Sequence, residues 1–201
     1  MSPRRSTSRD RLIRTAAQLF YEHGIHRTSV DRVVAESGLT KPTLYSHFSS
    51  KDELVDAVMA YRDHNWRALF DARIAAASSP EQGLNAILDF LEDFIQDADF
   101  RGCALVSGSV EILDASQPGR MTAARNKLEN RRQMERLARE AGLADPEQFA
   151  FALSLLFEGA IVTAYVEGDQ AAGRKARKAA ERLIESHKCG PDFSDLNQAE
   201  N

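Results

Sequence analysis

The sequence predicts an all-helical protein of about nine helices, and three observations lead to this fold class. Apolar residues recur at intervals of three and four along almost the whole chain, which is the period of an amphipathic helix. Sustained alternation of apolar and polar residues between turn residues, the pattern of a half-buried strand, is missing from the sequence. Capping residues, glycines and prolines divide the periodic segments. We therefore expect helices joined by short connections.

The first four predicted helices have clear starts and stops. Ser8 can cap the first helix, and Gly24 ends it. The second helix ends at Gly38, and Thr40 then caps a very short third helix. Ser50 begins the fourth helix. These four helices are expected at about residues 8–23, 29–37, 40–48 and 50–77.

The fourth helix is longer than a small domain needs. It runs from Ser50 to the break at Ser78-Ser79-Pro80, which is about 40 Å at a rise of roughly 1.5 Å per residue. We expect it to join two domains. The first is an N-terminal three-helix domain at residues 6–66, and the second is a C-terminal helical domain at residues 67–189.

Five further helices are expected in the C-terminal part. They lie at about residues 80–98, 103–114, 120–140 and 149–166, with a last amphipathic segment through Ala176 and Ile184. The helix at 149–166 is apolar on a wider arc than one core face requires, so part of its surface is expected to meet another partner. The tail at 190–201 is expected to be flexible.

Composition and cysteine usage limit the class of protein. A hydrophobic share of 43% with 28% charged residues is ordinary for a globular chain. No window approaches the roughly 18 uninterrupted apolar residues of a membrane span, and the basic start has no apolar run behind it. Cys103 and Cys189 lack a C-x-x-C spacing and a histidine at ligand spacing. We expect reduced thiols in a cytoplasmic protein.

Basic side chains concentrate at the N-terminal end, although the net charge of the chain is -4. Residues 1–52 contain nine basic and five acidic side chains, whereas the remainder contains 17 basic and 25 acidic ones. A basic end on an acidic body indicates that one end approaches a polyanion. Chance clustering of solvated charges remains an alternative explanation.

The stretch TKPTLYSHF, which begins at Thr40, has the features of the second helix of a helix-turn-helix. Leu44 and Phe48 lie one turn apart and form its predicted inner face. The residues between them point elsewhere, and their hydroxyls, amine and imidazole suit base edges and phosphates. The preceding helix ends at Gly38, which gives the layout whose second helix enters a major groove. We predict a helix-turn-helix at about residues 29–48.

Other functions are also compatible with such a stretch. A catalytic cluster or a metal site is disfavoured because the sequence lacks H-E-x-x-H, G-x-S-x-G and a glycine-rich phosphate loop. No catalytic residue, metal ligand or cofactor is predicted. A capped joint between two helices explains Thr40 and Ser50 equally well, but not an outward Tyr45. A helical protein-interaction module without DNA affinity, or a helical small-molecule-binding protein or enzyme, remains an alternative.

The segment AAQLFYEHGIHRTSVDRVVAESGLTKPTLYSHFSSKDELVDAVM resembles the N-terminal domain of TetR-type transcriptional regulators. The family's pattern includes a helix ending in F-x-x-x-G, then T-[ST]-[VI]-x-x-[IV]-A, G-[VL]-[ST]-x-x-x-[LI]-Y-x-H-F and a K-x-x-L start to the long helix, and this sequence departs from it at Val34, where the pattern has alanine. The resemblance covers about the first sixty residues, and later only the all-helical layout and the stretch RGCALVSGSVEI look similar. It implies a homodimer that binds a partly palindromic double-stranded DNA operator. Such a protein is usually a repressor, released by a small-molecule effector in the C-terminal domain.

The resemblance also implies which residues meet the operator through the helix at 40–47. Lys41 and Thr43 are the first candidates for reading bases, and Tyr45, His47 and Lys51 stand where the family touches phosphates. The full predicted DNA-binding set is Arg27, Ser29, Thr40, Lys41, Thr43, Tyr45, Ser46, His47 and Lys51. Three more cations, expected either as an arm near the minor groove or as a solubilising tail, are Arg4, Arg5 and Arg9.

Pocket residues for an effector are predicted only by apolar or aromatic character, which an ordinary core residue shares. The predicted set is Trp66, Phe70, Leu91, Phe94, Cys103, Val106, Val110, Glu111, Met121, Leu128, Phe151 and Tyr165. Glu111 and Glu158 are expected to meet either a cationic effector or, more commonly, a salt-bridge partner in Arg125, Arg131 or the partner chain. Cys103 begins a helix and is either a redox-sensitive thiol or an inert buried one.

The last two helices carry the dimer prediction. Their apolar residues are expected to pair with symmetry mates in a four-helix interface. The predicted interface set is Leu153, Leu156, Phe157, Ala160, Ile161, Ala164, Leu183 and Ile184. The alternative is that these side chains complete the core of a monomer.

Overall fold

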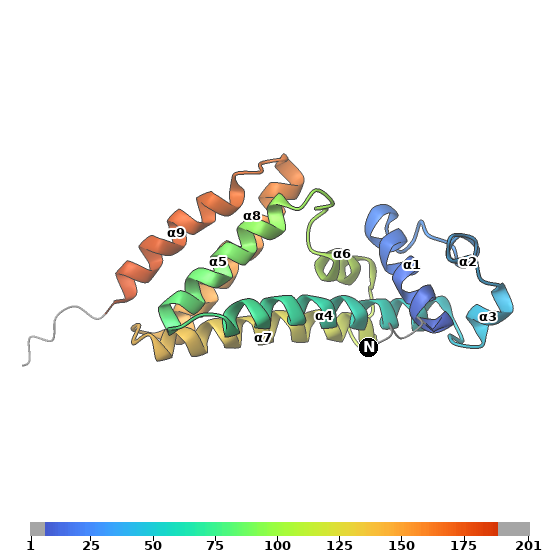
Figure 1. Cartoon of the computed structure of the whole chain (residues 1–201), viewed down its shortest axis with the longest axis horizontal. Helices are drawn as coiled ribbons and strands as arrows, with labels where there is room; N and C mark the ends of the chain where they lie inside the picture. The colour runs from blue at the N-terminus through green and yellow to red at the C-terminus, as the bar shows by residue number, and fades with distance from the viewer. Residues whose placement is uncertain (1–6, 189–201) are drawn as a thin grey trace, which may run out of the picture. The chain divides into compact units, whose positions relative to one another are not determined.

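The computed structural model describes residues 7–188 and places nine α-helices in that range (Figure 1). They are α1 Ser8–His23, α2 Val30–Ser37, α3 Lys41–Tyr45, α4 Lys51–Ala75, α5 Pro80–Gln96, α6 Ala104–Glu111, α7 Pro118–Glu140, α8 Pro146–Glu167 and α9 Ala172–His187. The predicted all-helical fold is confirmed. The only β-type pairing in residues 7–188 is an isolated bridge between Leu143 and Lys188. Predictions that fall outside the described residues concern Arg4, Arg5, Cys189 and the tail at 190–201.

The described helices form two compact units. The first contains the residues up to Asp71 together with Asp99–Leu128, and the second contains Ala72–Ala98 and the residues from Glu129 onward. The sequence predicts a single boundary near residues 66 and 67, whereas α6 and the N-terminal part of α7 belong to the same unit as α1, α2 and α3. Both α4 and α7 contribute one part to each unit.

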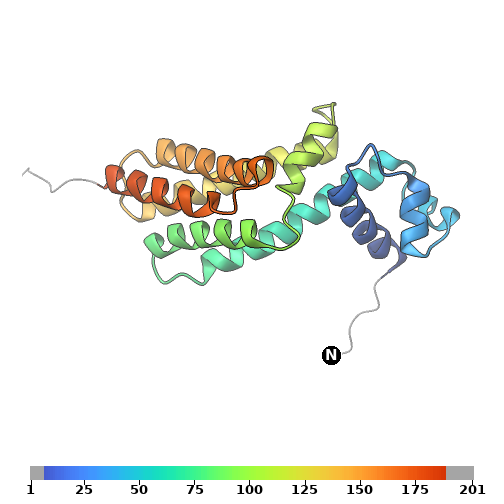
Figure 2. The ribbon, with the colours of Figure 1, turned by 90° about the horizontal axis from the view of Figure 1, so that it is seen from above.

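The core of the first unit is built on α1. Its residues Leu12, Ile13, Ala16, Leu19 and Phe20 follow the predicted three- and four-residue spacing, and all are buried. This face packs against α2, α3 and α6, as Figures 1 and 2 show for α2 and α3. Burial of each large apolar side chain contributes about 1.5–3 kcal/mol. The N-terminal helices are therefore held together mainly by the apolar stripe of α1.

The start of α1 differs from the prediction at two residues. The N-cap is Thr7, not Ser8: the Thr7 hydroxyl accepts from the Asp10 amide at 3.1 Å, and the Asp10 carboxylate accepts from the Thr7 amide at 3.3 Å. Hydrogen bonds to the Asp10 carboxylate from the Thr7 side chain and then from the Thr7 backbone lower the pKa of Asp10. Ser8 lies in the first turn, where its hydroxyl pairs with His47 Nε2 at 2.7 Å. Arg9 is a residue of α1, so it cannot belong to an arm or a tail.

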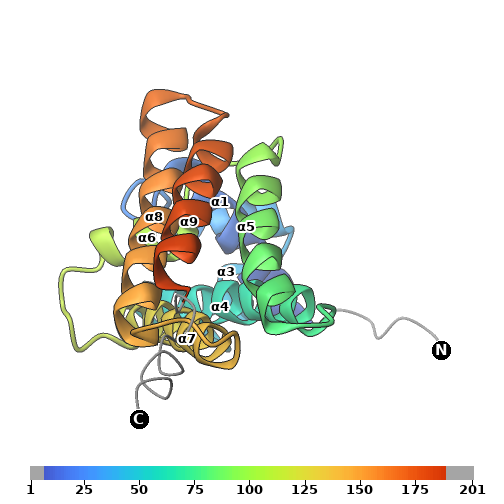
Figure 3. The same cartoon turned by 90° about the vertical axis from the view of Figure 1, so that its left-hand side faces the viewer.

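The second unit is a helical bundle in which α5, α8 and α9 pack together (Figures 2 and 3). Gly83 allows α5 to approach the C-terminal part of α7 closely, because an added Cβ would lie 2.7 Å from Leu137 Cδ2. On the other side of α5, Arg177 of α9 forms ion pairs with Asp89 and Glu92. Hydrogen bonds from Arg177 to both carboxylates favour its charged form. Packing and an ion-pair group thus fix α5 between its neighbours.

The residues predicted for the dimer interface are corrected by the packing of α8. Five of them are buried inside the second unit, where α9 and α5 of the same chain cover that face of α8; these are Leu153, Phe157, Ala160, Ile161 and Ala164. Leu156, Leu183 and Ile184 are half-buried. The five buried side chains therefore complete the core of the chain itself, which is the alternative named above. The large apolar side chains that α8 exposes are Phe151, Leu155, Val162, Tyr165 and Val166.

By length and composition, α8 is the one helix in residues 7–188 that could cross a membrane. It carries Glu158 near its middle and packs against α9 and α5. A core helix of a helical bundle passes the same test of length and composition. The apolar character of α8 therefore has an explanation in packing.

Candidate nucleic-acid interface

Capping residues define the connection between α2 and α3. The Ser29 hydroxyl accepts from the Arg32 amide at 3.1 Å and begins α2. Gly38 ends α2 with a φ of 60°, the left-handed conformation that glycine adopts without steric cost. The Thr40 hydroxyl then accepts from the Thr43 amide at 3.3 Å and begins α3. The chain therefore changes direction sharply within three residues.

Arg11 of α1 fastens the end of α2. Its Nε and Nη2 atoms donate to the Ser37 carbonyl at 2.8 and 2.5 Å, and Nη2 also donates to the Gly38 carbonyl at 3.0 Å. Carbonyls at the end of a helix lack partners within the helix, and a cation there suits the helix dipole. The turn between α2 and α3 is thus anchored on α1.

The inner side of α3 is apolar, as the spacing predicts. Leu44 and Phe48 are both buried. The helix itself ends at Tyr45 with Ser46 as C-cap, shorter than the predicted segment at 40–48, yet the following turn still brings Phe48 into the core. The Arg9 guanidinium lies 5.2 Å from the centre of the Phe48 ring. This anchor fixes the orientation of the opposite side of α3.

The outer side of α3 is polar. Tyr45 has 49% of its surface exposed, and the Ser46 hydroxyl donates to the Thr43 carbonyl at 2.7 Å. Of the predicted DNA-binding residues, the structure leaves exposed Arg27, Ser29, Thr40, Lys41, Tyr45 and Ser46. Three are half-buried, namely Thr43, His47 and Lys51. Tyr45 therefore points outward, as the interpretation of α3 as a recognition helix requires.

Lys41 is paired within the helix-turn-helix. Its Nζ lies 2.9 Å from Asp31 Oδ1 of α2, and both side chains are exposed. The hydrogen bond from Lys41 to this carboxylate raises the pKa of Lys41, with a further contribution from the negative charge of Asp31. Exposed ion pairs contribute little to stability. Lys41 can therefore exchange Asp31 for another anion at small cost.

Lys51 and Glu111 hold the connection between α1 and α2 from two sides. Lys51 Nζ donates to the Ile25 carbonyl at 2.6 Å. Glu111, the last residue of α6, accepts from the Ile25 and His26 amides at 2.8 Å each. This corrects the expectation that Glu111 meets a cationic effector or an arginine. Its carboxylate instead satisfies two backbone N–H groups.

The start of α4 already carries a carboxylate. Glu53 accepts from the Ser49 amide at 2.6 Å and from the Ser49 hydroxyl at 2.8 Å, and these hydrogen bonds lower the pKa of Glu53. The Ser50 hydroxyl accepts from the Glu53 amide at 3.1 Å. The free N–H groups at a helix start favour an anion such as a phosphate. The Glu53 carboxylate occupies part of that position.

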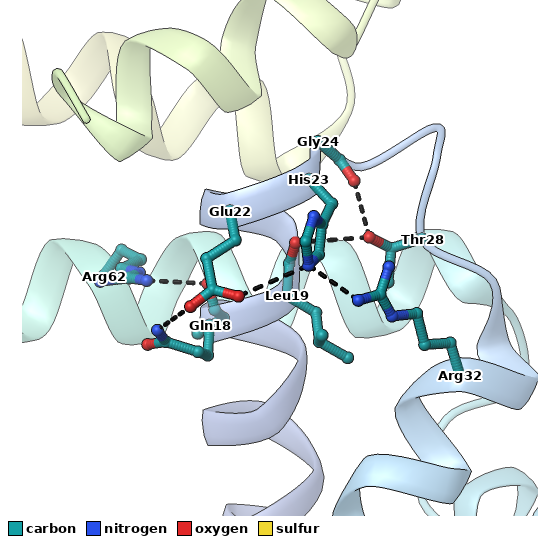
Figure 4. A network of polar contacts seen from close by, with 9 residues as sticks. Gln18, Leu19, Glu22, His23, Gly24, Thr28, Arg32 and Arg62 are labelled. Atoms are coloured by element: carbon teal, nitrogen blue, oxygen red, sulfur yellow. Dashed lines mark hydrogen bonds and ion pairs between the residues drawn. The ribbon is translucent and has the colours of Figure 1, made fainter. Parts of the chain in front are cut away.

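A polar network at the end of α1 was missed by the sequence reasoning (Figure 4). Arg32 of α2 donates through Nη2 to His23 Nε2 at 2.8 Å. Gln18 donates to Glu22, whose Oε2 lies 3.5 Å from His23 Nε2. The i, i+4 spacing of Gln18 and Glu22 is visible in the sequence. The contact between His23 and Arg32 depends on the fold and has no such signal.

The predicted pocket residues of the first unit form a small aromatic and polar group rather than one cavity. Trp66 and Phe70 stack with ring centres 6.1 Å apart, and Lys127 lies 6.0 Å from the Trp66 ring. Lys127 Nζ also lies 3.4 Å from Cys103 Sγ. Cys103 is a buried free thiol. Val110 and Met121 are exposed.

A buried polar cluster next to this group was also missed. Asp63 Oδ1 accepts from Asn126 Nδ2 at 2.8 Å and lies 3.1 Å from Arg67 Nε, and both Asp63 and Asn126 are buried. Arg67 Nη2 is a buried donor without a hydrogen-bond partner in the described residues. In the sequence, Asp63 resembles an ordinary polar residue of a helix face. Only the packing of α7 on α4 makes it part of the interior.

The pocket residues predicted in the second unit have unlike surroundings. Leu91 is fully buried in the core, whereas Phe151 and Tyr165 are exposed on α8. The Arg131 guanidinium lies 5.4 Å from the centre of the Phe151 ring. Within residues 7–188, no group of three or more histidine, cysteine or acidic residues is placed to hold a metal ion.

A crevice in the first unit lies between α1, α4 and α6, and we call it the α1–α4–α6 crevice. Its empty space is about 370 Å³, including the space at its mouth. Apolar side chains from α1 and α4 line most of it, together with Arg62, Ser107 and Glu111. Of the residues predicted for a ligand pocket, Glu111 alone lines this crevice.

Two family models match the chain. The model described as bacterial regulatory proteins, tetR family, matches residues 12–58, which contain α2, the turn and α3. The model described as tetracyclin repressor-like, C-terminal domain, matches residues 80–180. The first match includes the start of α4, and the two matches together cover most of the described helices.

Curated relatives are regulators of transcription. The HTH-type transcriptional activator FasR of Mycolicibacterium smegmatis is 31% identical over 102 residues, 51% of this chain and 46% of that protein. The uncharacterized HTH-type transcriptional regulator YxaF of Bacillus subtilis is 24% identical over 170 residues, 83% and 89% of the two chains. The chain thus spans less than half the length of FasR in this match.

Solved structures share the fold. SCO4454, a TetR-family transcriptional regulator from Streptomyces coelicolor, superposes with a TM-score of 0.86 at 26% identity, covering 90% of this chain and 96% of that one. A putative tetR-type regulator, sav143 from Streptomyces avermitilis, gives a TM-score of 0.80 at 27% identity, covering 90% and 98%. With its helix-turn-helix and both family matches, the chain belongs to the tetR family of bacterial transcriptional regulators.

Proposed function

We propose that the protein is a homodimeric repressor that binds a partly palindromic operator through α3 and releases it when a small molecule binds its C-terminal helices. The proposal places the protein in the cytoplasm, where bacterial DNA is located. Its partners are double-stranded DNA, a second copy of the chain and a small-molecule effector. No cofactor and no catalytic step are part of it.

The observation that carries the proposal is the two-sided character of α3. Leu44 and Phe48 fix the helix from behind, while Tyr45 and Ser46 are exposed on the other side. Arg11 holds the preceding turn with three hydrogen bonds, so the outer side is presented in a fixed orientation. A preorganised helix with short donors and acceptors suits the major groove.

The predicted contacts with DNA fall into two classes. Lys41, Thr43 and Ser46 are proposed to reach base edges, with Lys41 exchanging its exposed Asp31 partner for DNA. Tyr45 and His47 are proposed to bind phosphates. Arg27, Ser29, Thr40 and Lys51 complete the proposed set. Lys51 has three N–H donors, and one of them binds the Ile25 carbonyl, so a phosphate would use the others.

The dimer is proposed to form through α8. Five large apolar side chains on this helix are exposed although the same helix packs inward with its other residues: Phe151, Leu155, Val162, Tyr165 and Val166. An exposed apolar patch of this kind is expected at a protein contact. A two-fold axis next to α8 would bring the same patch of both chains together. We propose these residues in place of the buried set named from the sequence.

The effector is proposed to contact the group around Trp66 and Phe70. Next to it lie the buried Asp63–Asn126 hydrogen bond and the Arg67 Nη2 donor that has no partner in the described residues. A buried N–H group without an acceptor is unfavourable, so an effector that supplies an acceptor to Arg67 would bind favourably there. Binding releases DNA only if the effector prefers the conformation that does not fit the operator.

Selection of DNA from a random pool by the purified protein tests the DNA-binding part of the proposal. We expect a partly palindromic consensus, with affinity that falls as salt rises, by roughly 0.9 in log K per phosphate contact in log salt. Thr43→Ala is expected to change the preferred sequence, whereas Tyr45→Phe is expected to weaken binding to all sequences alike. Lys175→Ala on α9 removes one exposed positive charge elsewhere and serves as the control.

Two results would contradict the proposal. Failure to enrich any sequence, with a protein that is folded by circular dichroism, would favour a protein-interaction module. An unchanged affinity and preference in both α3 variants would place the DNA contact on another element. A reporter gene under the selected operator then decides the sign of regulation: we expect lower expression with the protein present, whereas higher expression would make the protein an activator, as FasR is.

A further inference from the structure

Arg62 of α4 is a partly buried cation without an acidic partner. Its Nη2 donates to the Ala17 carbonyl of α1 at 2.7 Å, and its guanidinium lies 4.9 Å from the centre of the Tyr21 ring. In the part of the chain that the structure describes, Arg62 forms no ion pair. Burial lowers the pKa of Arg62, although an arginine remains charged at neutral pH.

A guanidinium in this position keeps unused binding capacity. It has five N–H donors in a flat arrangement that matches a carboxylate, and one of them is used by the Ala17 carbonyl. Removing a charge from water without a counter-ion is unfavourable. The Tyr21 hydroxyl donates to the Gly102 carbonyl at 2.9 Å and accepts from the Arg101 amide at 2.7 Å. The Tyr21 ring that supports Arg62 is thus held in place.

Arg62 lines the α1–α4–α6 crevice, whose other walls are mainly apolar. Phe20 of α1 and Val55, Val58 and Met59 of α4 form these walls. Gly108 of α6 packs so closely on Met59 that an added Cβ would lie 2.6 Å from Met59 Sδ. The empty space of the crevice, about 370 Å³, includes open solvent at its mouth, and two charged side chains, Arg62 and Glu111, stand among its apolar walls.

Glu111 also lines the crevice, and its negative charge must be considered. Both of its carboxylate oxygens accept backbone hydrogen bonds, from the Ile25 and His26 amides at 2.8 Å. The Lys51 ammonium binds the Ile25 carbonyl in the same segment. The charge of Glu111 is therefore already balanced by donors on the α1–α2 connection. Within the described residues Arg62 donates to one carbonyl and pairs with no carboxylate, so it keeps unused N–H donors for a ligand in the crevice.

We propose that the α1–α4–α6 crevice binds a small monocarboxylic acid with an apolar body, whose carboxylate pairs with Arg62 and whose body lies against Phe20, Val58 and Met59. The Ser107 hydroxyl adds one hydrogen-bonding group at the wall formed by α6. This site is made by the first unit alone and includes α1 of the helix-turn-helix domain. It is separate from the effector group around Trp66 and Phe70, and it does not depend on the proposed function.

Methionine methyl groups give a direct test by NMR on the full-length protein. The chain has four methionines. Met59 lies in the crevice, Met121 is exposed on α7, and Met134 is buried in the second unit. The probe is 3-phenylpropanoate, because its ring shifts the resonance of a nearby methyl group, and 3-phenylpropan-1-ol is the uncharged control. We expect saturable shifts of Met59 with the acid, and roughly tenfold or weaker affinity for the alcohol.

Variants separate the charge from the apolar space. Arg62→Gln retains an N–H donor for the Ala17 carbonyl but removes the charge, so we expect it to reduce the affinity for the acid to that for the alcohol. Arg125→Gln, on the exposed side of α7, should leave both affinities unchanged. Ala104→Leu fills the crevice from α6 and should abolish the Met59 response to both compounds. Dispersed methyl spectra of each variant verify that it is folded.

Three outcomes would overturn the proposal. The first is that Met59 does not respond to millimolar acid. The second is that acid and alcohol bind equally well, which would remove the role of Arg62. The third is that Met134 responds while Met59 does not, because the ligand would then lie in the second unit. None of these outcomes bears on whether the protein binds an operator.

Discussion

Replacement of Glu111 by alanine removes the acceptor that α6 gives to the α1–α2 connection. Two hydrogen bonds to the carboxylate are lost, one from the part-buried Ile25 amide and one from the exposed His26 amide. Hydrogen bonds to a charged group contribute about 1.5–3 kcal/mol, and solvent reduces this value at an exposed site. Ile25 is buried, so its amide would be left without an acceptor. We expect Glu111→Ala to lower the free energy of unfolding by about 2–3 kcal/mol.

Urea unfolding and amide hydrogen exchange measure this effect separately. The unfolding midpoint reports the total loss of stability, while exchange of the Ile25 and His26 amides reports the local opening. Glu111→Gln is the matched variant: its single carbonyl oxygen can accept from one amide, so about half of the loss is expected. A loss below about 0.5 kcal/mol in Glu111→Ala, with unchanged exchange at both amides, would refute the role assigned to this carboxylate.

Three further predictions concern the helix-turn-helix and the start of α4. Arg11→Met keeps the length of the side chain but loses the hydrogen bonds to the Ser37 and Gly38 carbonyls. We expect weaker binding to the selected operator. We also expect the free energy of unfolding to fall by roughly 1–2 kcal/mol, measured as a thermal midpoint several degrees lower. Gly38→Ala places a side chain at a φ of 60° and should destabilise the protein by about 1 kcal/mol in chemical unfolding, more than Gly159→Ala in the middle of α8. Because hydrogen bonds lower the pKa of Glu53, its carboxylate stabilises the fold above its ordinary pKa, and this contribution is lost as the pH falls through the lowered value. Unfolding curves between about pH 6 and pH 3 should therefore show a smaller decrease for Glu53→Gln than for the unchanged protein, and equal decreases would contradict this assignment.

The sequence was most informative where a feature depends on local spacing. The left-handed Gly38, the cap at Thr40 and the inner face of Leu44 and Phe48 all follow from rules that apply within one or two turns. These features define the helix-turn-helix. The predicted N-cap of α1, Ser8, is wrong by one residue, because the adjacent Thr7 also carries a hydroxyl and satisfies the same pattern.

Contacts between distant segments could not be derived in this way. Arg11 meets the end of α2 over a separation of 26 residues, and Glu111 meets Ile25 over 86. A side chain that binds a backbone group leaves no period and no motif in the sequence. The apolar arc of α8 shows the same difficulty. Periodicity indicates that Leu153 and Phe157 are apolar and share a face, but the fold decides whether a helix of the same chain covers that face.

Lys51 and Glu111 bind the α1–α2 connection from different parts of the chain, and a hybrid protein can separate them. A chimera that joins the first 66 residues of this chain to the body of a relative would keep Lys51 and its bond to Ile25 but lose Glu111. The helix-turn-helix of such a chimera would then lack the two hydrogen bonds that Glu111 of α6 accepts from the α1–α2 connection. A chimera meant to carry the DNA specificity of this chain should therefore include Glu111, the last residue of α6, as well as the first sixty or so residues. The two segments are far apart in the gene.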